Sequence, residues 1–133
     1  MSWFKELWQN SREKGQYYER QAQKYLVAEG LTPIECNYYC PFGELDVIMK
    51  QGDTLVFVEV KYRKNNARGG ANYALGAQKQ ARLKRTIYHY LAAKGLTNQP
   101  IRVDYVAITG DGSANINWIK MYCSPLQQNK NYV

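Results

Sequence analysis

The sequence predicts a single domain of the α/β or α+β class with one sheet and helices that cover it, and three observations carry this prediction. Residues 43–49 and 55–63 have the composition of two β-strands, and Gly52-Asp53 between them suits a tight turn. Residues 15–29 and 78–94 instead carry apolar residues at helical spacing, and a glycine follows each segment. A sheet covered by helices is an arrangement that buries both kinds of apolar surface.

The elements are predicted in the order helix, three strands, helix, strand, with one added strand. The first helix, 15–29, has core spacing at Ala22, Tyr25 and Leu26 and ends at Gly30. A strand over 34–39 and a turn at 41–43 then lead into the hairpin of 43–49 and 55–63. We predict that residues 65–72, rich in Gly, Asn and Arg, form a loop before the second helix.

The second helix, 78–94, is predicted to end at Gly95 and to bury one apolar side, formed by Leu83, Ile87, Tyr90 and Leu91. A strand over 101–108, a turn at 110–113 and a last strand within 115–122 complete the domain. The predicted organisation is an amphipathic extension over 1–14, one domain over 15–122 and a polar tail over 123–133.

The Gly52-Asp53 turn sets the register of the hairpin. A two-residue type II′ turn accepts this pair because glycine supplies the positive φ at its first central position. Gln51 then faces Thr54, which places Asp46 opposite Glu59 and Glu44 opposite Lys61. Because side chains alternate along a strand, these four charged residues are expected to share one face. The opposite face is predicted to be apolar and buried, and it consists of Leu45, Val47, Met49, Val56, Val58 and Val60. Ile48 and Phe57 are predicted to lie on the same face as the four charged residues.

Two facing carboxylates indicate chemistry more than stability. At about 4 Å their repulsion costs roughly 1 kcal/mol in water and about 4 kcal/mol near a protein surface. A hard divalent cation reverses this interaction, and Mg²⁺ typically binds one or two carboxylates. We therefore predict Asp46 and Glu59 as metal ligands, with the Val60 carbonyl as a third oxygen. Lys61 would stabilise an attacking hydroxide or a phosphorane. An ordinary surface hairpin would explain Glu44 opposite Lys61, but it explains Asp46 opposite Glu59 badly.

The pattern of an Asp followed by Glu-x-Lys on the next strand resembles the PD-(D/E)xK signature of the restriction-endonuclease-like nucleases, with Leu45 where the signature has Pro. A longer set of residues resembles the YraN-like family, which is similar to archaeal Holliday junction resolvases. This resemblance covers about 15–108, and it rests on Gly15, Glu19, Ala22, Tyr25-Leu26, Gly30, Asn37, GELDVI from Gly43, LVFVEVKYR from Leu55, Lys79-Gln80 and Arg82-Leu83.

The resemblance implies a restriction-endonuclease-like αβββαβ core and a Mg²⁺-dependent DNA endonuclease, with Mn²⁺ as a substitute. It also implies branched, junction-like DNA as substrate and a homodimer, since two symmetric cuts need two sites. The alternative is a non-catalytic nucleic-acid-binding protein on a nuclease fold. A third reading is a scaffold that uses the tryptophan-containing segment 1–12 to reach a partner or a membrane.

Two further carboxylates are candidate site residues. Glu44 is expected to hold Lys61 in place or to help bind a second metal. The resemblance places Glu19, on the first helix, near the metal; the alternative is an ordinary, partly exposed glutamate. Gln78 and Gln80 are candidates for supporting the site, and the sequence does not choose between them.

Basic residues surround the predicted site in the sequence and indicate phosphate-backbone binding. The candidates are Arg63, Lys64, Arg68, Lys79 and Arg82, and the alternative is a solvated helix face. The net charge of +7 and the pI of about 9.3 also suit a polyanionic partner.

The sequence shows no stretch of the roughly 20 apolar residues that span a bilayer, and no signal-peptide pattern. We therefore expect no transmembrane segment and a cytoplasmic protein, in which the three cysteines stay reduced.

Overall fold

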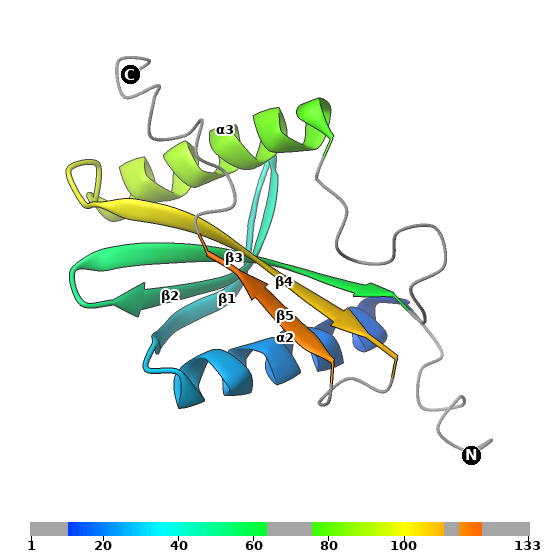
Figure 1. Ribbon diagram of the computed structural model, residues 1–133. Coiled ribbons are helices and arrows are strands. Elements are labelled where there is room, and N and C mark those ends of the chain that lie inside the picture. The colour runs from blue at the N-terminus through cyan, green and yellow to red at the C-terminus, as the bar shows by residue number, and fades with distance from the viewer. Residues whose placement is uncertain (1–10, 64–75, 111–114, 121–133) are drawn as a thin grey trace.

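Two helices lie on opposite faces of one five-stranded sheet (Figure 1). The computed structural model describes residues 11–63, 76–110 and 115–120. The elements follow in the order α2 (Ser11–Ala28), β1 (Thr32–Cys40), β2 (Gly43–Gln51), β3 (Thr54–Arg63), α3 (Ala77–Lys94), β4 (Ile101–Thr109) and β5 (Ile116–Ile119). This confirms the predicted αβββαβ order with one added strand. The predicted loop over 65–72 lies outside the described residues.

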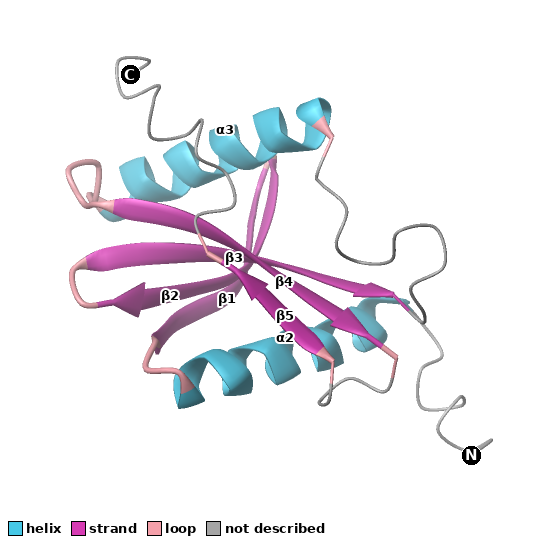
Figure 2. Ribbon diagram, viewed as in Figure 1, coloured by secondary structure: helices cyan, strands magenta, loops and turns pink. Residues whose placement is uncertain are grey.

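The sheet is mixed, and its strands are arranged in the order of the chain, β1-β2-β3-β4-β5 (Figure 2). The β1–β2, β2–β3 and β4–β5 pairs are antiparallel, whereas β3 and β4 are parallel. Parallel neighbours need a crossover connection, and α3 provides it. The crossover carries α3 over one face of the sheet while α2 covers the other.

The turn between β2 and β3 has the geometry that the sequence predicts. Gly52 has a φ of 60°, and Asp53 is not among the residues with positive φ, as a type II′ turn requires. The register runs from Gln51 opposite Thr54 to Val47 opposite Val58, as predicted. The regular pairing ends there, so Asp46 and Glu59 are not a ladder pair.

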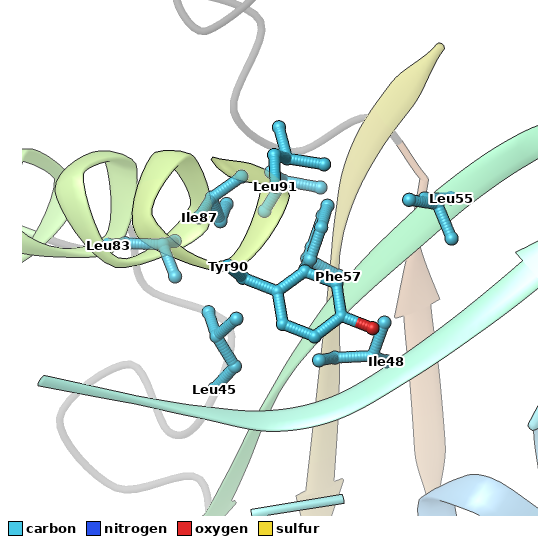
Figure 3. Close-up of a cluster of buried hydrophobic side chains, with 9 residues drawn as sticks. Leu45, Ile48, Leu55, Phe57, Leu83, Ile87, Tyr90 and Leu91 are labelled. Atoms are coloured by element: carbon cyan, nitrogen blue, oxygen red, sulfur yellow. The ribbon is translucent and has the colours of Figure 1, made fainter. Parts of the chain in front are cut away.

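Both faces of the hairpin are buried, and this corrects the predicted division into one core face and one mixed face. Val47, Met49, Val56 and Val58 pack with the α2 residues Ala22 and Leu26, in agreement with the prediction. On the second face, Ile48 and Phe57 lie beneath α3 with no more than 1% of their surface exposed. Leu45 was expected beside Val47, but it packs in the α3 cluster instead (Figure 3).

The helices use the residues that their spacing predicts. Leu83, Ile87, Tyr90 and Leu91 are buried on α3, and each such side chain contributes about 1.5–3 kcal/mol relative to an exposed position. Gly95 ends α3 with a φ of 69°, and its N–H points to the Leu91 and Ala92 carbonyls. The first helix begins at Ser11, before the predicted Gly15. Within the described residues, neither helix has the length and apolar character of a membrane span.

Candidate functional site

The strands lose their regularity at Asp46. The β1–β2 register pairs Cys36 with Val47 and Tyr38 with Leu45, but it leaves out Asn37 and Asp46 between them. Asn37 has a φ of 55°, which makes it the one non-glycine residue with positive φ in the described part of the chain. Leu45 and Val47 would share a face of a regular strand, yet they pack on opposite faces. The backbone at Asp46 is therefore irregular, and side chains do not alternate strictly between the two faces of the sheet there.

Asp46 has no partner in the β2–β3 register, and its side chain contacts the backbone of β3. Its Oδ2 accepts a hydrogen bond from the Val60 N–H at 3.0 Å. Glu19 reaches Asp46 from α2 and shares a hydrogen bond with it. Glu59, from β3, and Glu44, from β2, act on the same carboxylates through their charges. We call Glu19, Glu44, Asp46 and Glu59 the acid cluster.

Lys79 of α3 supplies a positive charge at the edge of the acid cluster. Its Nζ lies 3.9 Å from Glu59 Oε1. Glu59 is 7% exposed, whereas nearly half of the Lys79 side chain is open to solvent. A pair this long and half solvated compensates little of the cost of burying Glu59.

Burial and mutual repulsion raise the pKa of three carboxyls in the acid cluster. Burial, followed by the charges of Asp46 and Glu44, raises the pKa of Glu19 from 4.5 to about 8. Burial raises the pKa of Asp46 from 3.8 to about 6, against the lowering effect of the Val60 N–H. The pKa of Glu59 lies well above its usual value because the side chain is buried beside Asp46. Without a counter-ion, these groups share protons at neutral pH.

The donor atoms of the acid cluster suit a hard divalent cation. Glu19 Oε1 is buried and has no hydrogen-bond partner among the described residues. Carboxylate oxygens are the ligands that Mg²⁺ and Mn²⁺ accept in proteins. Among the residues that the structure describes, however, no three His, Cys, Asp or Glu side chains are gathered closely enough to form a ready-made metal site. The carboxylate oxygens are suitable ligands for a divalent cation, but the side chains would have to move closer together to bind one.

The structure brings together part of the predicted set. Asp46, Glu59, Glu44 and Glu19 form the acid cluster. Lys61 lies on β3 two residues after Glu59, but no ion pair joins it to Glu44 in the described chain. Val60 contributes its N–H to Asp46, and a role for its carbonyl stays a prediction.

The predicted nucleic-acid-binding residues fall into two groups. Lys79 and Arg82 lie exposed on α3, and Arg63 ends β3. Lys64 and Arg68 lie outside the described residues. The sequence assigned Lys79 to phosphate binding alone; the structure also places it beside Glu59.

Asn37 is the site residue that reasoning from side-chain chemistry missed. It belongs to the residues that carry the family resemblance, and asparagine tolerates the left-handed region better than most residues. An asparagine inside an otherwise strand-like segment was the available signal. Strained backbone of this kind is concentrated at functional sites.

Comparison with known proteins places the chain in a family. The model of the uncharacterised protein family UPF0102 matches residues 18–108. A UPF0102 protein of Pseudoalteromonas translucida (strain TAC 125) is 82% identical over 120 residues, which span 90% of this chain and 98% of the relative. A second, from Colwellia psychrerythraea, is 46% identical over 125 residues, or 86% and 97% of the two chains. A third, from Neisseria meningitidis serogroup C, is 40% identical over 110 residues, or 83% and 94%. The chain therefore belongs to the uncharacterised protein family UPF0102.

Proposed function

We propose that this protein is a divalent-cation-dependent nuclease of the PD-(D/E)xK type that hydrolyses phosphodiester bonds in DNA. The observation that carries the proposal is the acid cluster. Asp46 and Glu59 are held together against their repulsion, and Glu19 adds a buried oxygen that lacks a partner. A fold that needed only stability would not retain three partly or fully buried carboxyls that raise one another's pKa.

The side chains have distinct roles in this proposal. Asp46 and Glu59 would hold Mg²⁺ or Mn²⁺, which supplies positive charge for activating water and for neutralising the phosphate. The Val60 N–H holds one Asp46 oxygen and so orients the carboxylate. Lys61, on the Glu59 face of β3, stabilises the charge that develops as water adds to phosphorus and the bond to the leaving oxygen breaks. Lys79, which lies beside Glu59, would bind a phosphate of the substrate.

The proposed substrate is DNA, with branched DNA as the preferred form. Support comes from the similarity to junction resolvases and from a net charge of +7. Symmetric cleavage of a junction would need two copies of the site, so we also propose a homodimer.

The test is cleavage of a four-way DNA junction with and without Mg²⁺ by the wild type and by Asp46→Ala. We expect cleavage that depends on Mg²⁺ and is lost in the variant. Asp53→Ala is the matched control, because Asp53 is an exposed carboxylate at the far end of the same hairpin. Undiminished cleavage by Asp46→Ala would refute the site assignment.

One observation favours a second candidate, a nucleic-acid-binding protein without catalysis. In the described residues the acid cluster is not arranged as a finished metal site, and Lys79 already lies beside Glu59. Calorimetric titration with Mn²⁺ separates the candidates. Binding that disappears in Glu59→Gln supports the nuclease, and the absence of such binding supports the non-catalytic protein.

A further inference from the structure

A groove of about 580 Å³ lies between α2 and β1, beside the acid cluster. On the α2 side it is lined by side chains at helical spacing, including Gln16, Glu19, Gln23 and Val27. These residues lie next to the face of α2 that packs on the sheet through Ala22 and Leu26. The groove is therefore a feature of the outer flank of α2 and not a gap in the core.

The groove and the acid cluster share Glu19. This residue lines the groove and also hydrogen-bonds to Asp46. Asn37, with its left-handed backbone, lines the opposite wall at the level where Asp46 leaves the ladder. A ligand in the groove would thus lie directly beside the proposed hydrolytic centre.

Most of the lining surface of the groove is apolar, and its polar groups are ones that a nucleotide can contact. Gln16, Gln23 and Asn37 present side-chain amides, which both donate and accept hydrogen bonds as base edges do. Cys36 Sγ donates to Gln23 Oε1 at 3.0 Å, which orients that amide. Arg20 and Lys24 add two exposed cations that complement phosphate.

The size of the groove selects one nucleotide over a duplex. Pockets of about 300–1,000 Å³ hold a single small ligand, and the bases of a duplex are stacked inside the helix, where a protein pocket cannot surround one. A base can enter such a groove only when it is out of the helical stack, as at a flap, a bubble or a branch point.

We propose that the groove between α2 and β1 binds one unpaired nucleotide of the substrate strand, next to the phosphodiester at the acid cluster. The proposal rests on the proposed function, because it takes nucleic acid as the substrate. It adds the requirement for an unpaired nucleotide at a defined place, with Gln16, Gln23 and Asn37 as base-contacting residues.

Cys36 lines the groove and can report its occupancy. The full chain carrying Cys40→Ser and Cys123→Ser keeps Cys36 as its one thiol, and its alkylation by iodoacetamide is followed in a chelating buffer. We expect a single-stranded dT10 to slow alkylation of Cys36 about tenfold at saturation, and a blunt-ended duplex of ten base pairs, formed from two complementary strands and free of loops, to leave the rate unchanged. Equal protection by the duplex, or no protection by dT10, would overturn the proposal.

A second measurement compares two amide substitutions on α2 by fluorescence anisotropy with labelled dT10. Gln23→Ala removes a groove amide and should weaken binding about fivefold, the effect of losing about one hydrogen bond. Gln21→Ala is the matched control, because Gln21 is equally part of α2 but does not line the groove. Equal effects of the two substitutions would count against the groove, and circular dichroism verifies that both variants fold.

Because the chelating buffer removes divalent cations, the alkylation experiment measures binding in the groove without cleavage. Failure of the groove proposal and failure of the nuclease assignment therefore give different results. If the nuclease assignment fails, the wild type shows no Mg²⁺-dependent junction cleavage, or its cleavage survives Asp46→Ala, while dT10 still protects Cys36. Loss of the groove assignment would appear as unprotected Cys36 in a protein whose cleavage still requires Asp46.

Discussion

Asp104 and Asp46 are both aspartates on central strands, and the protein treats them in opposite ways. Asp104 is fully buried, and Arg102 approaches its two oxygens through Nε and Nη2 at 3.0 Å each. Trp118 Nε1 donates to Oδ2 at 2.9 Å, and Gln51 in turn fixes Arg102. Asp46 instead accepts one backbone N–H, interacts with the carboxyls of Glu19, Glu44 and Glu59, and has the partly solvated Lys79 as its cation.

The contrast shows that this fold can bury a carboxylate with a complete set of partners. Buried polar groups in native proteins are nearly always satisfied. The unpartnered Glu19 oxygen and the raised pKa values of the acid cluster are therefore local departures from a rule that Asp104 obeys. Such a departure is expected where a ligand completes the site.

The largest expected effect is on stability at Asp104. Asp104→Ala leaves Arg102 and Trp118 without their acceptor, and breaking a buried pair typically costs about 3–5 kcal/mol. The measurement is urea denaturation of the variant and the wild type at pH 7. A loss below about 1 kcal/mol would mean that the Asp104 cluster behaves like a surface pair, and the comparison would fail.

The second expected effect is a pH dependence that arises from the acid cluster. The folded-state pKa values of Glu19 and Asp46, about 8 and about 6, lie above their usual values of 4.5 and 3.8. The folded protein therefore binds more protons than the unfolded chain, and this stabilisation is complete below about pH 4 and lost as the pH rises through 6 to 8.

In a chelating buffer, we expect the free energy of unfolding to fall by about 2 kcal/mol between pH 5 and pH 8, a value reduced because Glu19 is partly exposed. Urea denaturation at several pH values measures the slope. Mg²⁺ should restore stability at pH 8. A slope of opposite sign, or one that is undiminished in the double variant Glu19→Gln with Asp46→Asn, would assign the pH dependence elsewhere.

A third effect concerns the repulsion within the acid cluster. Burial and the neighbouring Asp46 oppose ionisation of Glu59, and Glu59→Gln removes this group without changing the shape of the side chain. The substitution should therefore raise the stability at alkaline pH by about 1 kcal/mol in the absence of a divalent cation. The melting temperature in chelating buffer gives the readout. Destabilisation by more than about 1 kcal/mol would show that Glu59 has a structural role like that of Asp104.

The smallest expected effect is at Lys79. Lys79→Ala should change stability by less than about 0.5 kcal/mol, because the ion pair with Glu59 is long and half solvated. It should weaken DNA binding and reduce the slope of affinity against salt by about one.

Lys94→Ala provides the control for Lys79→Ala. Lys94 lies at the opposite end of α3 and forms a comparable ion pair with Glu35 at 3.6 Å. Binding titrations at several salt concentrations compare the two variants. An equal loss of affinity would indicate diffuse electrostatics and not a phosphate contact at Lys79.

The sequence predicts what depends on local pattern. The turn at Gly52 sets the hairpin register, and the apolar spacing of α3 identifies its four predicted core residues. The placement of Lys79 beside Glu59 needed the crossover of α3, which no local pattern reports. The β1–β2 pairing is interrupted at Asp46, and the regular β2–β3 pairing ends next to it, at Val47. The position of Leu45 and the left-handed backbone of Asn37 accompany these interruptions, which the alternation of side chains along a single strand does not predict.

Asp104 illustrates the same limit. Arg102 and Asp104 are two residues apart and share a face of β4, so their pairing can be read from the sequence. The contribution of Trp118 depends on β5 folding back along β4, which brings together residues distant in the chain.

The irregular backbone of β1 also affects how the protein behaves in a crowded solution. Within the described chain, β1 is an edge of the sheet, where a flat strand would be a template for pairing with another molecule. Pro33, the register shift before Glu35 and the left-handed Asn37 all interrupt that edge. A substitution that straightened β1 would therefore favour aggregation and would also displace Asp46. The same few backbone angles of β1 thus bear on both the solubility of the protein and the geometry of the acid cluster.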